Sequence, residues 1–364
     1  MAAQISGFHG SDIEKIEAVY GVKKEDIINF SSNVNPLGIS KRLKEELASH
    51  IDSITAYPDR EYTKLRQAIA SYVNTDYNTI ITGNGCTELI SLLIRQKAAK
   101  KALLLAPSYS EYEHEVTLAG GECSYYPLLE RDNFVLRTDE LLSQLTPCTD
   151  LLVLCNPNNP TSSLIDREDM RRIVGHCREQ GIFVMVDETY MEFCTTEAKD
   201  TAISLTKEFT NLMVLRGISK FFAAPGLRLG YGVCGDKELL AKLIAKQNPW
   251  SINSLAAVAG EIMFSDKDYI TSTKDFMYGE RRRFTNLLSQ IPGLQLYPAH
   301  ANFVLVKICA NDSNATQLFE TAIRKGFMIR DCSTFASLGT RFFRICFLQK
   351  EQDDALLQFL RETF

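Results

Sequence analysis

The chain has 364 residues, of which 45% are hydrophobic and 23% are charged, and this suits a globular protein with one large and one smaller domain. Its net charge of −5 gives no general reason to expect nucleic acid or an anionic membrane as a partner. No apolar stretch is long enough to span a bilayer, and the first residues lack the layout of a signal peptide, so we expect a cytoplasmic protein.

The ten cysteines include no Cys-x-x-Cys pair. Cys155, Cys234 and Cys346 lie within or at the end of apolar, strand-like runs. Thiols in such positions are typically reduced and buried. We therefore expect neither a disulfide framework nor a metal site.

A repeating pattern organises residues 80–220: a short apolar run, a polar or glycine turn, and then a helical pattern. The first unit predicts a strand at Ile80–Thr82 and a helix from about Thr87. The runs occur in "NTIITG", "KALLLAPS", "DLLVLCNP", "GIFVMVDE" and "NLMVLRGISK". Because they are continuously apolar, they indicate strands buried on both faces of a mainly parallel sheet covered by helices. The first regular helix of this part is expected near Glu61.

The pattern changes toward the C-terminus, where "ANFVLVKI", "FMIRDCS" and "RFFRICF" read as strands. Helices such as Ala315–Lys325 and Glu351–Thr363 separate or follow them, which predicts a smaller α+β lobe. We place an N-terminal segment at residues 1–39, packing with the small lobe, a large domain at 40–265 and a small domain at 266–364.

Ligands of parallel sheets bind beyond the carboxyl ends of the strands, so the residues that follow each strand are informative. The first strand is followed by Gly83-Asn84-Gly85-Cys86-Thr87. A glycine turn that opens a helix can bind a phosphate through backbone N–H groups, although an ordinary tight turn explains it equally well. The segment lacks both the third glycine of a dinucleotide fingerprint and the Gly-Lys-Ser/Thr of a P-loop.

The later strand ends carry further polar side chains. Tyr109 can stack on a planar ring or serve as a core tyrosine, and Asn159 can donate its amide to a phenolic oxygen. Asp187 directly follows an apolar strand and is expected to be nearly buried, so it needs a partner. The fifth strand end offers Lys220, with Arg228 shortly beyond it.

Together these groups supply what pyridoxal 5′-phosphate (PLP) requires. Lys220 would form the Schiff base with the cofactor aldehyde, and Asp187 would pair with the pyridinium nitrogen. Arg228 would bind the phosphate bidentately. This set predicts a PLP site at the carboxyl edge of the sheet.

Specific motifs carry a resemblance that covers essentially the whole chain. They are "NPNNPT", "DETY", "SK" followed by "PGLRLGY", and a late arginine in "FFRICF". The chain resembles the fold-type I PLP enzymes of the class I/II aminotransferase superfamily. The resemblance implies an α/β fold whose large domain holds a mainly parallel seven-stranded sheet between helices, with a smaller α+β domain.

Within that superfamily, the segments "FHGSDI", "FSSNVNPLG", "YPDREY", "GNGCTE", "NPWSINSLA" and "IRDCSTF" resemble the decarboxylases that act on L-threonine O-3-phosphate in cobalamin synthesis. The expected reaction is PLP-dependent decarboxylation of O-phospho-L-threonine, or a close phospho-amino acid, to (R)-1-amino-2-propanol O-2-phosphate. The near relatives are histidinol-phosphate aminotransferases, and transamination of histidinol phosphate or a similar compound is the alternative.

The resemblance also implies roles for individual residues and a homodimer with shared active sites, in which Tyr57 reaches the cofactor phosphate of the neighbouring subunit. The expected catalytic residues are Lys220, Asp187 and Tyr190. The expected cofactor contacts are Gly85, Cys86, Thr87, Tyr109, Asn159, Asp187, Tyr190, Ser219, Lys220, Arg228 and Tyr57. The expected substrate contacts are His9, Asn33, Gly38, Asn159, Arg330, which holds the phosphate, and Arg344, which holds the carboxylate.

Three positions depart from the pattern of the family. Gly217 stands where many relatives carry a phosphate-binding serine, Cys86 replaces an acidic residue, and Ser162 replaces the glycine of Asn-Pro-Thr-Gly. None of them touches the set of Lys220, Asp187 and Arg228, so we expect cofactor binding to be retained.

The sequence leaves the reaction open, because the Cα bond held perpendicular to the cofactor ring breaks and a motif does not show that orientation. A third hypothesis is a ligand-sensing regulator built on an aminotransferase fold. Such proteins usually carry an added DNA-binding module, and no basic helix-turn-helix segment precedes residue 30.

Overall fold

The computed structural model describes residues 8, 10, 12–310 and 313–364. Seven strands form the larger sheet, in the order β2-β8-β7-β6-β5-β3-β4. They are β2 (Ile80–Gly83), β3 (Lys101–Ala106), β4 (Glu122–Pro127), β5 (Leu151–Cys155), β6 (Phe183–Asp187), β7 (Leu212–Gly217) and β8 (Gly230–Cys234). The predicted seven-stranded, mainly parallel sheet is thus confirmed.

One strand of this sheet breaks the parallel arrangement. β8 runs antiparallel to both of its neighbours, β7 and β2. The turn between β7 and β8 holds only the short 3₁₀ helix Pro225–Leu227 and no crossover α-helix, and the chain reverses and pairs directly with the strand it has just left. That turn, residues 218–229, carries Lys220 and Arg228.

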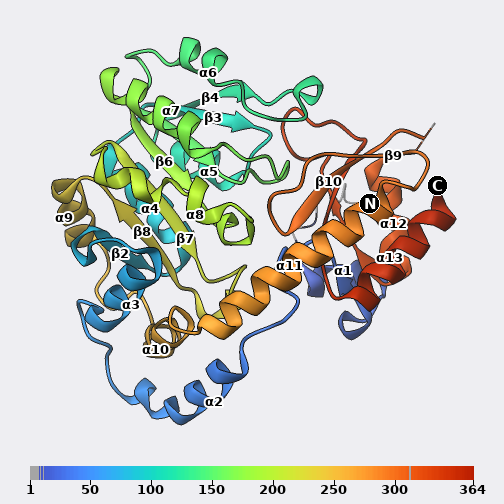
Figure 1. Ribbon diagram of the computed structural model, residues 1–364, viewed down its shortest axis with the longest axis horizontal. Coiled ribbons are helices and arrows are strands. Elements are labelled where there is room, and N and C mark those ends of the chain that lie inside the picture. The colour runs from blue at the N-terminus through green and yellow to red at the C-terminus, as the bar shows by residue number, and fades with distance from the viewer. Residues whose placement is uncertain (1–7, 9, 11, 311–312) are drawn as a thin grey trace.

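The sheet is buried on both faces because its strands carry apolar residues at successive positions. Along β5, Leu152 and Leu154 belong to one core cluster, whereas Leu151 and Val153 belong to the other. Alternate side chains of a strand point to opposite faces, so a continuous apolar run feeds two cores. Helices α4 (Gly85–Lys97), α5 (Glu111–Leu118) and α9 (Lys237–Lys246) pack on one face of the sheet. Helices α3 (Thr63–Val73), α7 (Arg167–Glu179) and α10 (Ser254–Met263) pack on the other (Figure 1).

The helices around this sheet are α2 (Lys41–Ser49), α3 (Thr63–Val73), α4 (Gly85–Lys97), α5 (Glu111–Leu118), α6 (Thr138–Gln144), α7 (Arg167–Glu179), α8 (Glu197–Asp200), α9 (Lys237–Lys246) and α10 (Ser254–Met263). The prediction of a first helix near Glu61 was wrong, because α2 precedes it. α2 has nine residues and is mostly polar, and its apolar face is formed by Leu43, which is buried, and Leu47, so the segment carries little apolar content. The helix begins at the side chain of Ser40, which accepts a hydrogen bond from the Leu43 N–H at 3.0 Å.

A second, smaller body contains the C-terminal part and the beginning of the chain. Its antiparallel sheet has the order β12-β13-β10-β9, and a parallel pair joins β1 to β11. Its elements are α1 (Ile13–Tyr20), β1 (Ile28–Asn29), β9 (Leu294–Leu296), β10 (Phe303–Ile308), α12 (Ala315–Arg324), β11 (Phe327–Met328), β12 (Arg330–Asp331), β13 (Phe342–Cys346) and α13 (Lys350–Thr363). The predicted small α+β unit is confirmed.

Helix α11 (Lys267–Leu288) runs from the large sheet to the small one (Figure 1). The pairing of β1 with β11 ties the N-terminal segment to the smaller body. The domain boundaries near residues 40 and 265 stay a prediction.

Cys155, Cys234 and Cys346 are buried, as predicted, and all ten cysteines are free thiols. Within the described ranges, no group of three His, Cys, Asp or Glu side chains is arranged to hold a metal ion. No helix in that part of the chain combines the length and the apolar character needed to cross a membrane.

Candidate active site

The carboxyl edge of the large sheet gathers the predicted cofactor residues. Asp187 ends β6 and is 4% exposed, and Lys220 follows β7 in the turn to β8. Burial is the largest cause that raises the pKa of the Tyr109 phenol. The charges of Glu111, Tyr190 and Asp187 raise it further, so Tyr109 lies near the last two of these residues. Residues far apart in the chain thus meet at one edge, as the parallel strands predict.

An anion site is built where α4 begins. Gly85, the first residue of α4, has φ +75°, and a Cβ added there would lie 2.5 Å from Nη2 of Arg228. Only glycine lets the guanidinium approach the free N–H groups of this helix end so closely. The guanidinium donates to the carbonyl of Pro225 at 3.1 Å, and none of the ion pairs within the described residues involves Arg228. Positive charge and N–H donors therefore converge on one point that suits a phosphate.

Three donors hold the carboxylate of Asp187. Oη of Tyr112 donates to Oδ2 at 2.7 Å. The backbone N–H and the hydroxyl of Thr189 both donate to Oδ1, at 2.9 Å and 2.6 Å. Tyr112 was not predicted from the sequence, and its one signal there is its position three residues after Tyr109, at the start of α5.

The amine of Lys220 rests on the N-terminal segment. Its Nζ donates to the carbonyl of Ser32 at 2.6 Å. Burial is the largest cause that lowers the pKa of Lys220, to about 8, and the charges of Arg344 and Arg228 lower it further. An amine with this pKa changes its protonation state near neutral pH.

We call residues 31–38 the strap, because they cross the site between the two bodies. The backbone N–H of Asn35 donates to the carbonyl of Lys220 at 3.0 Å. The side-chain amide of Asn35 donates to the carbonyl of Phe221 at 2.8 Å and to the hydroxyl of Tyr269, in α11, at 2.9 Å. Asn33, with φ 55°, donates its amide to Oη of Tyr190 at 3.3 Å. The strap therefore fixes both the lysine turn and Tyr190.

Two arginines of the smaller body contact the N-terminal part of the chain. Arg344, in β13 and 5% exposed, donates to the carbonyl of Ser31 at 2.9 Å and to Oδ1 of Asn159. Arg330, in β12, donates to the carbonyl of Phe8 and to the hydroxyl of Thr334. Burial lowers the pKa of Arg330, and the charge of Arg344 lowers it further. The ion pairs of the described residues do not include Arg344 or Arg330, and the charges of Asp331 and Asp12 act on Arg330 from further away. Both guanidinium groups can therefore still pair with an anionic ligand.

Comparison with known proteins agrees with this geometry. The aminotransferase class I and II family matches residues 25–360. The chain belongs to that family. A threonine-phosphate decarboxylase from Salmonella typhimurium is 34% identical over 361 residues, which cover 99% of this chain and 98% of that protein. The predicted class I/II resemblance is thus confirmed.

Two solved structures show the shared fold. A histidinol-phosphate aminotransferase from Clostridium acetobutylicum has a TM-score of 0.86 and 31% identity, covering 92% of this chain and 98% of its own. A histidinol-phosphate aminotransferase from Sinorhizobium meliloti in complex with pyridoxal-5′-phosphate has a TM-score of 0.85 and 22% identity, covering 96% and 93%. The fold is therefore the one shared by PLP-dependent enzymes of the class I/II family, as predicted.

The residues present fit this cofactor. Gly85 leaves room for Arg228 at a helix N-terminus, which suits the phosphate, and Asp187 offers a buried carboxylate to a ring nitrogen. Nε of Arg344 and Oδ1 of Asn33 are buried without a hydrogen-bond partner, which indicates that a polar ligand completes the site.

The remaining predicted residues have different positions. Ser219 is half-buried beside Lys220, and Thr87 is exposed on the first turn of α4. The carbonyl of Gly38 accepts a hydrogen bond from Tyr269 at 2.6 Å. Tyr57 is 80% exposed, and the centroid of its ring lies 4.7 Å from that of Trp250. Within one chain, no described contact joins Tyr57 to the other predicted cofactor residues. His9 lies outside the described residues.

Local packing and hydrogen bonding accommodate the three departures from the family pattern. A Cβ added to Gly217 would lie 2.9 Å from Sγ of Cys86, so the thiol fills the space that a serine at 217 would need. Ser162 has φ 60°, as a glycine would, and its hydroxyl accepts hydrogen bonds from the N–H groups of His300 and Ala301 at 2.9 Å and 2.8 Å.

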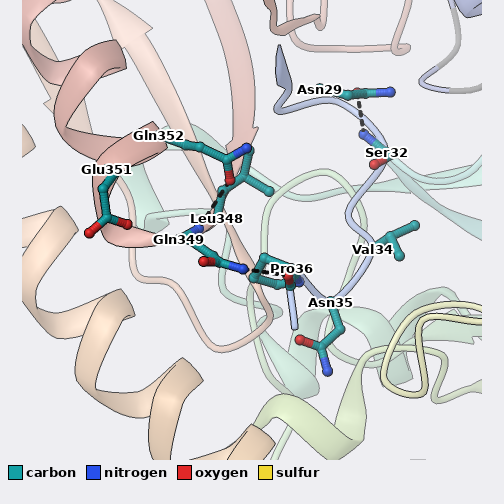
Figure 2. Close-up of a pocket in the computed structure, with 9 residues that line it drawn as sticks. All are labelled: Asn29, Ser32, Val34, Asn35, Pro36, Leu348, Gln349, Glu351 and Gln352. Atoms are coloured by element: carbon teal, nitrogen blue, oxygen red, sulfur yellow. Dashed lines mark hydrogen bonds between the residues drawn. The ribbon is translucent and has the colours of Figure 1, made fainter. Parts of the chain in front are cut away.

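A cavity of about 490 Å³ lies beside the strap (Figure 2). It is lined by Asn29, Ser32, Val34, Asn35, Pro36, Leu348, Gln349, Glu351 and Gln352, none of which was predicted to bind cofactor or substrate. The amide of Gln349 donates to the carbonyl of Pro36 at 3.1 Å, so these two polar groups of the cavity lining bond to each other. We assign no ligand to it.

Proposed function

We propose that this enzyme is a PLP-dependent decarboxylase of O-phospho-L-threonine, or of a close phospho-amino acid, and forms (R)-1-amino-2-propanol O-2-phosphate for the cobalamin side chain. The observation that carries the proposal is the pair of cations, Arg330 and Arg344. Both are held by neutral acceptors and are close enough for one to lower the pKa of the other. A substrate that carries both a carboxylate and a phosphate neutralises both charges at once, whereas histidinol phosphate carries only the phosphate and leaves Arg344 for the carboxylate of the keto acid.

Cofactor binding in this proposal uses the edge of the large sheet. Arg228 and the N–H groups of Gly85, Cys86 and Thr87 hold the phosphate, and Asp187 pairs with the ring nitrogen. When bound, PLP withdraws the electron pair that a departing group leaves at Cα of the substrate. The amide NH2 of Asn159 would donate to the ring oxygen, since its Oδ1 accepts a hydrogen bond from Arg344.

Substrate residues then decide which group departs. Arg344 binds the carboxylate, and Arg330, with His9 and Asn33, binds the phosphate. The Cα–carboxylate bond breaks and carbon dioxide leaves, so one proton must replace the carboxylate at Cα. Lys220 can deliver that proton from Nζ, since its pKa of about 8 keeps a protonated fraction near neutral pH.

The proposal includes a homodimer. Exposed apolar side chains lie near Tyr57 in the chain and in space. Its ring contacts that of Trp250, which is 41% exposed. Ile54, which is 61% exposed, lies in the 3₁₀ helix Ile51–Thr55 that precedes Tyr57. A second copy of the chain covers this patch and receives Tyr57 at its cofactor phosphate. Mixing Lys220→Ala protein with Tyr57→Phe protein should then restore activity, because a mixed dimer contains one site with both native residues. No gain on mixing would count against shared sites.

The function is tested by incubating the PLP-loaded protein with O-phospho-L-threonine, without a keto acid, and following carbon dioxide release. Sustained release over many turnovers is expected. The alternative is transamination of histidinol phosphate, which the likeness to the aminotransferase from Clostridium acetobutylicum favours. Amino transfer from histidinol phosphate to a keto acid, with no carbon dioxide from phosphothreonine, would replace the decarboxylase proposal.

A further inference from the structure

The carboxylate of Asp187 has four lone-pair sites, and the protein fills them unevenly. Two donors occupy Oδ1: the backbone N–H of Thr189 at 2.9 Å and its hydroxyl at 2.6 Å. A single donor, Oη of Tyr112, occupies Oδ2 at 2.7 Å. A carboxylate oxygen accepts about two hydrogen bonds. One acceptor position therefore remains, and it is on Oδ2.

Tyr112 is itself firmly placed. It is the second residue of α5, is 1% exposed, and packs in the core cluster between α4, α5 and the sheet. Its ring edge meets the ring of Tyr109 at 5.6 Å. Burial and the charge of Asp187 raise the pKa of Tyr112, so its phenol keeps its proton and remains a donor.

We propose that Tyr112 is a positioning residue, which orients Asp187 so that Oδ2 alone is presented to the ring nitrogen of PLP. This inference rests on the proposed PLP function. Tyr112 fixes the carboxylate plane from one side and Thr189 fixes it from the other, so the acid cannot rotate. Through this hydrogen bond Tyr112 also draws negative charge from the oxygen that faces the ring, and so sets how strongly the ring nitrogen holds its proton.

The test compares three variants in apoprotein titrated with PLP. Y112F removes one hydrogen bond to a charged carboxylate and is expected to weaken PLP binding about tenfold. T189V leaves the N–H donor on Oδ1 and should weaken binding less. The control is Y126F, because Tyr126 is also buried and its hydroxyl donates to the carbonyl of Arg137 at 3.2 Å. It should bind PLP like the native protein.

A second readout is independent of activity: the ¹⁵N chemical shift of PLP labelled at the ring nitrogen. Y112F should move this shift, and Y126F should not. Replacing Tyr112 by 3-fluorotyrosine keeps the ring and strengthens the donor, so it should move the shift in the opposite direction. This variant tests the proposal even where Y112F lowers the thermal stability of the apoprotein.

One outcome is that the native protein binds PLP while Y112F and Y126F show equal PLP affinities and equal ¹⁵N shifts. That result would overturn the role of Tyr112 and leave the proposed function intact. Failure of the native protein itself to bind PLP would overturn both. A larger shift in T189V than in Y112F would mean that Oδ1, not Oδ2, faces the ring.

Discussion

Arg330 offers the sharpest test of the substrate. Its guanidinium is fixed by the carbonyl of Phe8 and the hydroxyl of Thr334, and stacks over Phe335 at 5.2 Å, with no carboxylate paired to it among the described residues. A buried pair with a substrate phosphate is worth several kcal/mol, whereas an exposed one is worth under about 1 kcal/mol. Since about 1.4 kcal/mol is a factor of ten, Arg330→Ala should lower kcat/KM for phosphothreonine about a hundredfold or more.

The assay measures carbon dioxide release from phosphothreonine and from unphosphorylated threonine. The loss should fall mainly on KM for the phosphorylated substrate, with little change for threonine. Arg171→Ala is the matched control, since this exposed arginine pairs with Glu208 at 2.8 Å and lies away from the site. A small and equal loss for both substrates would refute the reasoning and make Arg330 a structural residue.

Three further predictions follow from the described contacts. Lys220→Ala should abolish the visible absorbance of the bound cofactor and all turnover, and retained activity would contradict the cofactor assignment. Gly85→Ala should weaken PLP binding measured by titration, because the added Cβ would lie 2.5 Å from Nη2 of Arg228 at a backbone φ of +75°. Burial is the largest cause that raises the pKa of Asp353, and the neighbouring carboxyl of Glu280 raises it further, so the folded state holds a proton that the unfolded state releases. The free energy of unfolding should therefore fall as pH rises from about 4 to about 9, and Asp353→Asn should flatten this slope in urea denaturation.

Two controls separate these effects from general damage. Gly226→Ala adds a Cβ that would have nothing within 4 Å, so its PLP affinity should be unchanged. An equal loss for both glycine variants would mean that the site does not depend on the close approach of Arg228. For Asp353, a pH slope that is the same with and without the carboxyl would show that other groups cause it.

The sequence by itself determined the large sheet and most of its carboxyl edge. Continuous apolar strands can be buried only between two layers of helices, and this physical requirement gave the fold class. The residues that follow such strands must meet at one edge of the sheet. The sequence alone therefore predicts that Asp187, Lys220 and Arg228 share one site. Helix α2 was missed because it is short and mostly polar, with an apolar face formed by Leu43 and Leu47.

Only the tertiary structure decided how that edge is completed. Tyr112 reaches Asp187 across 75 residues of sequence, and Ser32 reaches Lys220 across 188, and no local pattern encodes a pairing at such separations. The same holds for Arg228 above Gly85 and for Cys86 filling the space beside Gly217, which depend on side-chain volumes brought together by packing. Strand periodicity is a property of neighbours along the chain, whereas the orientation of a carboxylate is set by neighbours in space.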